Sequence, residues 1–251
     1  MKKHLLLLTL VLFFAVAGCS EQSNLSGTME LRVETEHFLL YSYPEDAQVA
    51  ELIAATLEEE YPVITSQLQT ELPEKVGVSV YPNMDLFRRA INDTSTGDWV
   101  TGVAWGNKIE MISPNNPGTA PAADEVTRVA VHEFTHLVVA AINPTAPKWL
   151  NEGVAVYYGK EREESKIRQL VMSKLEKGTL PAIRQFETSS QAFFEQDGYS
   201  IAYSIIDFIV SRYGTGALVG FIQHPTDYDR IFGVDEDSFV NAWKEYIEET
   251  Y

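Results

Sequence analysis

Alternation of hydrophobic and polar positions dominates the first half of the chain and predicts a sheet with helices. The expected strands are residues 29–35, 37–43, 75–81, 99–105 and 108–113. The last two predict a hairpin that turns at Gly106-Asn107. Residues 46–72 carry apolar side chains at helical spacing, which predicts a long amphipathic helix that Pro62 breaks or kinks. A short helix is expected around residues 84–91.

Helical spacing dominates the second half, after a cluster of Pro, Asn and Gly between Ser113 and Ala123. The expected helices are residues 122–142, 147–159, 161–177, 199–213, 216–223 and 236–249. The pattern predicts an α+β protein. A mixed β-sheet lobe with helices (residues 29–118) should precede a mostly helical lobe (residues 119–251), with the helix over 122–142 between them.

The first residues have the pattern of an export signal. Lys2 and Lys3 precede an apolar run that is shorter than the about 20 residues of a membrane-spanning helix. The run ends in Val16-Ala17-Gly18-Cys19, which resembles the lipobox of bacterial lipoproteins. That resemblance implies cleavage before Cys19, lipid (palmitate) on its thiol, and residues 20–28 as a tether on the outer face of a cell membrane. An ordinary signal peptide with an incidental cysteine, or an uncleaved anchor, remains open.

Composition and charge restrict the kinds of partner that the chain could bind. Cys19 is the only cysteine, so no disulfide supports the fold, and the about 230 residues after it are enough for a sizeable core. The chain has 36 acidic and 19 basic residues, a net charge of −17 that becomes −19 once Lys2 and Lys3 leave with the signal. So acidic a chain is a poor ligand for nucleic acid or anionic headgroups, and we expect no nucleic-acid partner.

The strongest candidate chemistry is the run His132-Glu133-Phe134-Thr135-His136. Residues four apart lie on one face of a helix, so both imidazoles can reach one metal ion while Glu133 faces a metal-bound water. The predicted helix is apolar on most sides, so these polar groups should be buried and need a partner, which a metal supplies. A catalytic zinc takes three protein ligands, and Glu152 is the candidate for the third. The alternatives are two structural histidines with a surface Glu, and a solvated Glu152.

The motif and the later stretch Trp149-Leu150-Asn151-Glu152-Gly153-Val154-Ala155 together resemble the gluzincin zinc metallopeptidases. These include thermolysin and the zinc aminopeptidases, and the chain is most similar to the small, exported peptidase MA-like proteins. The resemblance implies a zincin-like fold and one Zn²⁺ ion held by His132, His136 and Glu152, with Glu133 as general base.

A weaker resemblance involves Tyr199-Ser200-Ile201-Ala202-Tyr203-Ser204, which is similar to an aminopeptidase helix whose first Tyr stabilises the tetrahedral intermediate. It implies that Tyr199 is an oxyanion donor; a Tyr in the core or in an interface is the alternative. Tyr203 and His224 are lesser candidates.

The chain also departs from the aminopeptidases. The spacing from His136 to Glu152 is shorter, and Gly102-Val103-Ala104-Trp105-Gly106 replaces their Gly-x-Met-Glu-Asn strand, which binds the substrate amine. Aminopeptidase activity is therefore in doubt, although this strand could still line a cleft and pair with an extended peptide.

The function expected from these features is that of a monomeric, lipid-anchored, extracytoplasmic zinc metallopeptidase acting on a peptide or protein substrate. A non-catalytic zinc-binding lipoprotein, serving as a binding or assembly factor in the cell envelope, is the second hypothesis. A metal-free surface protein is the third.

Overall fold

The structure is a computed structural model that describes residues 27–115, 123–160, 162–183, 193 and 195–251. Its strands are β1 Glu30–Glu34, β2 Phe38–Ser42, β3 Val76–Tyr81, β4 Gly102–Trp105 and β5 Lys108–Ile112. They form one sheet in the order β1-β2-β3-β5-β4. Strands β2, β3 and β5 are parallel, and the edge strands β1 and β4 pair antiparallel to their neighbours. All five predicted strands, and the hairpin between β4 and β5, are confirmed.

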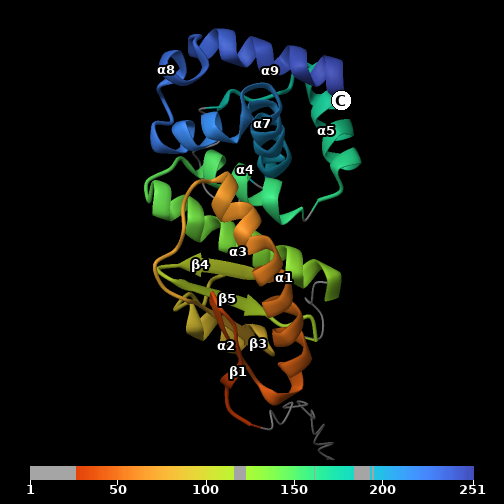
Figure 1. The fold of residues 1–251 in the computed structure, drawn as a ribbon. Coiled ribbons are helices and arrows are strands. Elements are labelled where there is room, and N and C mark those ends of the chain that lie inside the picture. Colours follow the sequence, from red (N-terminus) through yellow and green to blue (C-terminus); the bar gives the residue numbers. More distant parts are fainter. Residues whose placement is uncertain (1–26, 116–122, 161, 184–192, 194) are drawn as a thin grey trace, which may run out of the picture.

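The helices are η1 Pro44–Asp46, α1 Ala47–Gln67, α2 Met84–Ala90, α3 Ala123–Ile142, α4 Lys148–Gly159, α5 Glu164–Glu176, α7 Gly198–Gln223, α8 Tyr228–Phe232 and α9 Glu236–Thr250. Figure 1 shows the sheet lobe below, the helical lobe above, and α3 passing between them. The predicted α+β class is therefore confirmed. Helix α8 was not predicted, because its five residues are too few to show a helical period.

The sheet lobe has a core on each face of the sheet. On one face, β2, β3 and β5 pack against α1 and α3. The ring of Phe134 on α3 lies 5.4 Å from the rings of both Phe38 and Tyr61, measured between centroids. On the other face, Ile112 packs with Met84 and Phe87 of α2. Helix α3 is thus fixed against the sheet by large buried side chains.

The predicted break at Pro62 is wrong, because α1 continues through it to Gln67. Pro62 lies on the exposed side of the helix, where water can bind the carbonyl that loses its N–H partner. The buried stripe continues on both sides of it: Ala50, Ile53, Ala54, Leu57, Tyr61 and Ile64. Leu52 and Ala55, although apolar, face solvent. Burial of the stripe outweighs the local preference of proline to end a helix.

The helical lobe is built around α4 and α7. Helix α4 packs against α3 on one side and α7 on the other, while α5, α8 and α9 also contact α7. Gly214 has φ 80° and ψ 169°, which divides α7 in two, as the two helices predicted over 199–213 and 216–223 require. By length and composition α7 could cross a membrane, but this is weak evidence because the buried core helix of a soluble protein has the same character. Most of its residues are buried.

Several predictions concern residues that the structure does not describe. The signal segment, Cys19 and most of the tether lie in residues 1–26, outside the described part of the chain. Helix α5 was expected from residue 161, which is not described, and it begins at Glu164. The preceding Lys160 ends α4 in the left-handed conformation with φ 51°.

Candidate metal centre and its cavity

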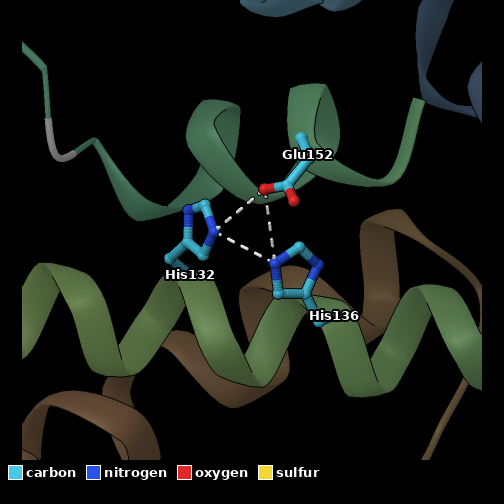
Figure 2. Close-up of side chains that lie close together, drawn as sticks. All are labelled: His132, His136 and Glu152. Atoms are coloured by element: carbon cyan, nitrogen blue, oxygen red, sulfur yellow. Dashed lines mark hydrogen bonds and ion pairs between the residues drawn. The ribbon is translucent and has the colours of Figure 1, made fainter. Parts of the chain in front are cut away.

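Helix α3 presents two different faces to its surroundings. Val126, Ala130, Phe134 and Val138 follow one another at steps of four and are buried in the core. The face that carries His132 and His136 is turned toward α4, which carries Glu152 (Figure 2). His132 and Glu133 are each only 7% exposed. The prediction that these polar groups lie in the interior is therefore confirmed for His132 and Glu133, while His136 is partly buried.

Three ligand atoms converge between α3 and α4. The Nε2 atoms of His132 and His136 are 3.0 Å apart, and Oε2 of Glu152 lies 3.5 Å from the first and 3.6 Å from the second (Figure 2). A triangle with these sides contains a point about 2.0 Å from each atom, which is the length of zinc–imidazole and zinc–carboxylate bonds. The spacing of the donor set therefore fits a zinc ion.

The turn between the helices brings Glu152 to this place. Helix α3 ends before Asn143, whose side-chain oxygen accepts the backbone N–H of Thr145 while its amide donates to the carbonyl of Ile222. Pro147 then caps α4. A Cβ at Gly153 would lie 2.9 Å from the carbonyl oxygen of Ala202, so only glycine lets α4 pack this closely on α7. The residue after Glu152 thus sets how closely α4 packs on α7.

Electrostatics favour an ionised Glu152. Burial alone would raise the pKa of this carboxyl group, but a hydrogen bond from His132 and the charges of His136 and Lys148 lower it below its usual range. The carboxylate therefore has the charge that a divalent cation requires.

Asn151 is a functional residue that the sequence analysis missed. Its Oδ1 lies 2.9 Å from Nδ1 of His136, and because an amide oxygen only accepts, this nitrogen must carry the proton. Nε2 of His136 then keeps its lone pair for a metal, which is the usual arrangement around ligating histidines. Asn151 directly precedes Glu152 in the same turn of α4, and that position is the sequence signal that points to it.

Glu133 lies against the edge strand of the sheet. A Cβ at Gly102 of β4 would approach Cγ of Glu133 to 2.8 Å and its Oε1 to 2.9 Å, closer than atoms can pack. The carboxylate occupies the space that any larger residue would fill. Gly102 is the second residue that the sequence analysis missed; only its place in the strand was recognised.

A cavity of about 170 Å³ lies beside the metal triangle. Its walls include His132 and Glu133 from α3, Trp99 and Gly102 from the segment at β4, and Arg162 and Tyr199 from the helical lobe. Four of the five predicted catalytic and metal residues lie at this cavity. His132 and Glu133 form part of its wall, and His136 and Glu152 adjoin His132 at its border.

The fifth, Tyr199, also lines this cavity, although it lies far from the motif in the chain. Its ring packs edge-on against Phe193 at 4.9 Å and under the guanidinium of Arg162 at 5.3 Å. Tyr203 lines a separate cavity, and His224 is exposed at the end of α7. The two lesser candidates therefore lie outside the site.

Comparisons with known proteins identify one family and several solved structures that are similar to the chain. Residues 65–249 match the Peptidase MA superfamily. No curated protein matches the chain in sequence. Solved structures that match include yeast LTA4 hydrolase in complex with Bestatin, with 13% sequence identity and a TM-score of 0.44. The match covers 89% of this chain and 37% of the yeast protein, so the chain spans little more than a third of that relative.

Proposed function

The chain belongs to the Peptidase MA superfamily, and on that premise we propose that it is a zinc-dependent metallopeptidase of the gluzincin type. One observation carries the proposal: Nε2 of His132, Nε2 of His136 and Oε2 of Glu152 converge beside a cavity that also holds the Glu133 carboxylate. A purely structural zinc site is closed by four protein ligands and has no use for a nearby base. Here three ligands converge and a carboxylate adjoins the open side.

The residues of this chain divide the work of peptide hydrolysis between them. When bound, zinc would lower the pKa of a water molecule and polarise the scissile carbonyl. His132, His136 and Glu152 would hold the ion. Glu133 accepts the proton of the attacking water and returns it to the leaving amine. The hydroxyl of Tyr199 donates a hydrogen bond to the carbonyl oxygen as its negative charge develops.

We also propose that the protein works as a monomer tethered to the outer face of a cell membrane through lipid on Cys19. The lipobox-like end of the apolar run supports this location, and residues 20–28 are long enough to separate the lipid from β1. A Cys19→Ser variant should leave the membrane fraction and the detergent phase. Unchanged partition of that variant would contradict the lipid anchor.

The test of the proposed activity is a peptide-library digest with purified mature protein, run with and without a zinc chelator. We expect cleavage that the chelator removes and added zinc restores. In the Glu133→Gln variant, turnover should fall by about 10²–10⁴, the usual contribution of a general base. Zinc content, measured by elemental analysis, should stay at one ion per chain.

The matched control is Glu125→Gln on the same helix, since Glu125 is exposed and lies outside the cavity. This variant should cleave like the wild type. Zinc binding without any chelator-sensitive cleavage would instead support the non-catalytic binding or assembly factor. Cleavage by Glu133→Gln at the wild-type rate would overturn the mechanism.

A further inference from the structure

Arg162 lies at the border of the metal site and has no part in the mechanism above. It follows Lys160, the left-handed residue that ends α4, and its side chain lines the same cavity as His132 and Glu133. Its guanidinium carbon lies 5.3 Å from the centre of the Tyr199 ring, a cation–π contact that holds it over the cavity.

The guanidinium of Arg162 has no carboxylate partner within the described part of the chain. Arg32, Arg88, Arg168 and Arg230 each form an ion pair with a nearby acid. Such pairs are expected in a chain with 36 acidic and 19 basic residues. Arg89 and Arg212 also form no ion pair with a described acid, so what sets the exposed Arg162 apart is its place in the wall of the metal-site cavity, where its five N–H donors can meet a ligand.

Acids lie close to Arg162 in the chain, but they are engaged elsewhere. Glu163 pairs with Lys166, and Glu164 pairs with Arg168. Asp207, which lines a neighbouring cavity together with Arg162, accepts hydrogen bonds from two tyrosine hydroxyls at 3.0 Å each. Arg162 thus borders two cavities, and no ion pair joins it to a carboxylate of the described residues.

The charges in the cavity wall indicate which kind of ligand would bind beside Arg162. Among the described residues that line the metal-site cavity, Arg162 alone carries a fixed positive charge, and Glu133 is the one acid. The planar fork of a guanidinium matches a carboxylate with two parallel hydrogen bonds.

We propose that Arg162 is a specificity-determining residue that binds a carboxylate of the peptide substrate close to the scissile bond. The inference rests on the proposed peptidase activity and deepens it by naming the substrate class: peptides with an acidic side chain, or a free C-terminal carboxylate, within a residue or two of the cleaved bond. Arg162 positions the substrate and takes no part in proton transfer.

The experiment uses the zinc-loaded mature protein and peptides that differ in one carboxylate only. The first peptide has neutral residues and blocked ends, the second has the same sequence with a free C-terminal carboxylate, and the third carries Glu in place of Gln beside the cleaved bond. We expect kcat/KM to be about tenfold higher for the second or the third, as a charged hydrogen bond at a partly exposed site gives. The gain should appear mainly in KM.

The Arg162→Gln variant should lose this preference, its kcat/KM becoming equal for the three peptides, and Arg162→Lys should recover only part of the preference. Arg212→Gln is the matched control, because Arg212 is exposed on α7 away from both cavities. Whichever of the second and third peptides shows the effect identifies the source of the carboxylate. Equal kcat/KM for all three peptides, or a preference that survives Arg162→Gln, would overturn the inference and leave the proposed activity intact.

A binding measurement separates this inference from the peptidase proposal. Peptide affinity is measured by calorimetry on the Glu133→Gln protein, with and without the second change Arg162→Gln. Tighter binding of the carboxylate peptide, lost with Arg162, supports the role of Arg162 even where no peptide is cleaved. Equal affinity of the neutral and carboxylate peptides counts against it.

Discussion

Two clusters of histidine and glutamate lie in this molecule, and they are built differently. In the sheet lobe, both oxygens of Glu58 accept hydrogen bonds from His37, one from the backbone N–H and one from ring Nδ1, each at 2.7 Å. The His37 ring also stacks on Tyr61 at 3.6 Å. Between α3 and α4, by contrast, two imidazole Nε2 atoms and one carboxylate oxygen face the same point.

The difference shows what distinguishes a ligand site from a structural pair. At Glu58 every acceptor has its own donor, so the pair is complete within the protein. At the metal centre, by contrast, three possible ligand atoms from three residues converge on one point, where a single cation can bind all of them at once. Residue type is the same in both clusters, so the convergence of acceptor atoms carries the functional information.

The largest expected effect is on zinc binding and activity, when the glutamate of each cluster is replaced by glutamine. Glu152→Gln should lose zinc on dialysis and lose more activity than the roughly 10²–10⁴-fold that removal of a general base costs. Glu58→Gln should retain both zinc and activity. Elemental analysis and the chelator-controlled digest measure the two outcomes. Zinc retained at full occupancy in Glu152→Gln would show that the two clusters do not differ in the proposed way.

A second effect concerns the tyrosine beside each cluster. Tyr199→Phe keeps the ring under Arg162 but removes the hydroxyl, and kcat should fall by about 10²–10³, as for other oxyanion donors. Tyr61→Phe removes a hydroxyl that accepts the backbone N–H of Leu72 at 3.3 Å, and kcat should not change. Steady-state kinetics decide. Equal kcat in Tyr199→Phe and wild type would return Tyr199 to a packing role.

The smallest effect is on stability and depends on pH. Burial favours the neutral form of Glu58, but hydrogen bonds from His37 and Thr35 lower its pKa below the usual 4.5. Glu58→Ala should therefore reduce the free energy of unfolding by about 2 kcal/mol at pH 7, the contribution of hydrogen bonds to a charged group.

The direction of the pH dependence follows from that lowered pKa. A depressed acid stabilises the fold above its unfolded-state pKa and loses the effect as pH falls through its folded-state pKa. The difference between Glu58→Ala and wild type should thus be constant above about pH 5 and shrink below pH 4.5. Urea titrations across this range measure it, and a difference that grows on acidification would contradict the assignment.

The features predicted correctly from the sequence are those with local causes. Helix α3 ends at Ile142, as predicted, and its two histidines lie on one face because residues four apart in a helix share a face. Glu152 could be named because a proline-containing turn leaves few ways to pack α4 on α3. The strands followed from simple alternation.

What could not be predicted depends on which elements meet in space. Pro62 disfavours a helix locally, yet α1 continues through it. Only the burial of the apolar stripe on both sides of Pro62 explains why the helix continues. Arg162 shows no pattern in the chain that separates it from other surface arginines, since its neighbours in the cavity come from α3, α7 and the segment at β4. Asn151 acquires its role only when α4 faces His136.

Gly102 limits how this metal centre could be rebuilt in another protein scaffold. A transplanted α3 would bring the two histidines and Glu133, and α4 would bring Glu152, yet the recess for the Glu133 carboxylate belongs to β4. In a host with any side chain at that point, the base would swing away from the ion even with every ligand in place. The smallest transferable unit is therefore two helices and one strand, and its least conspicuous member contributes by having no side chain.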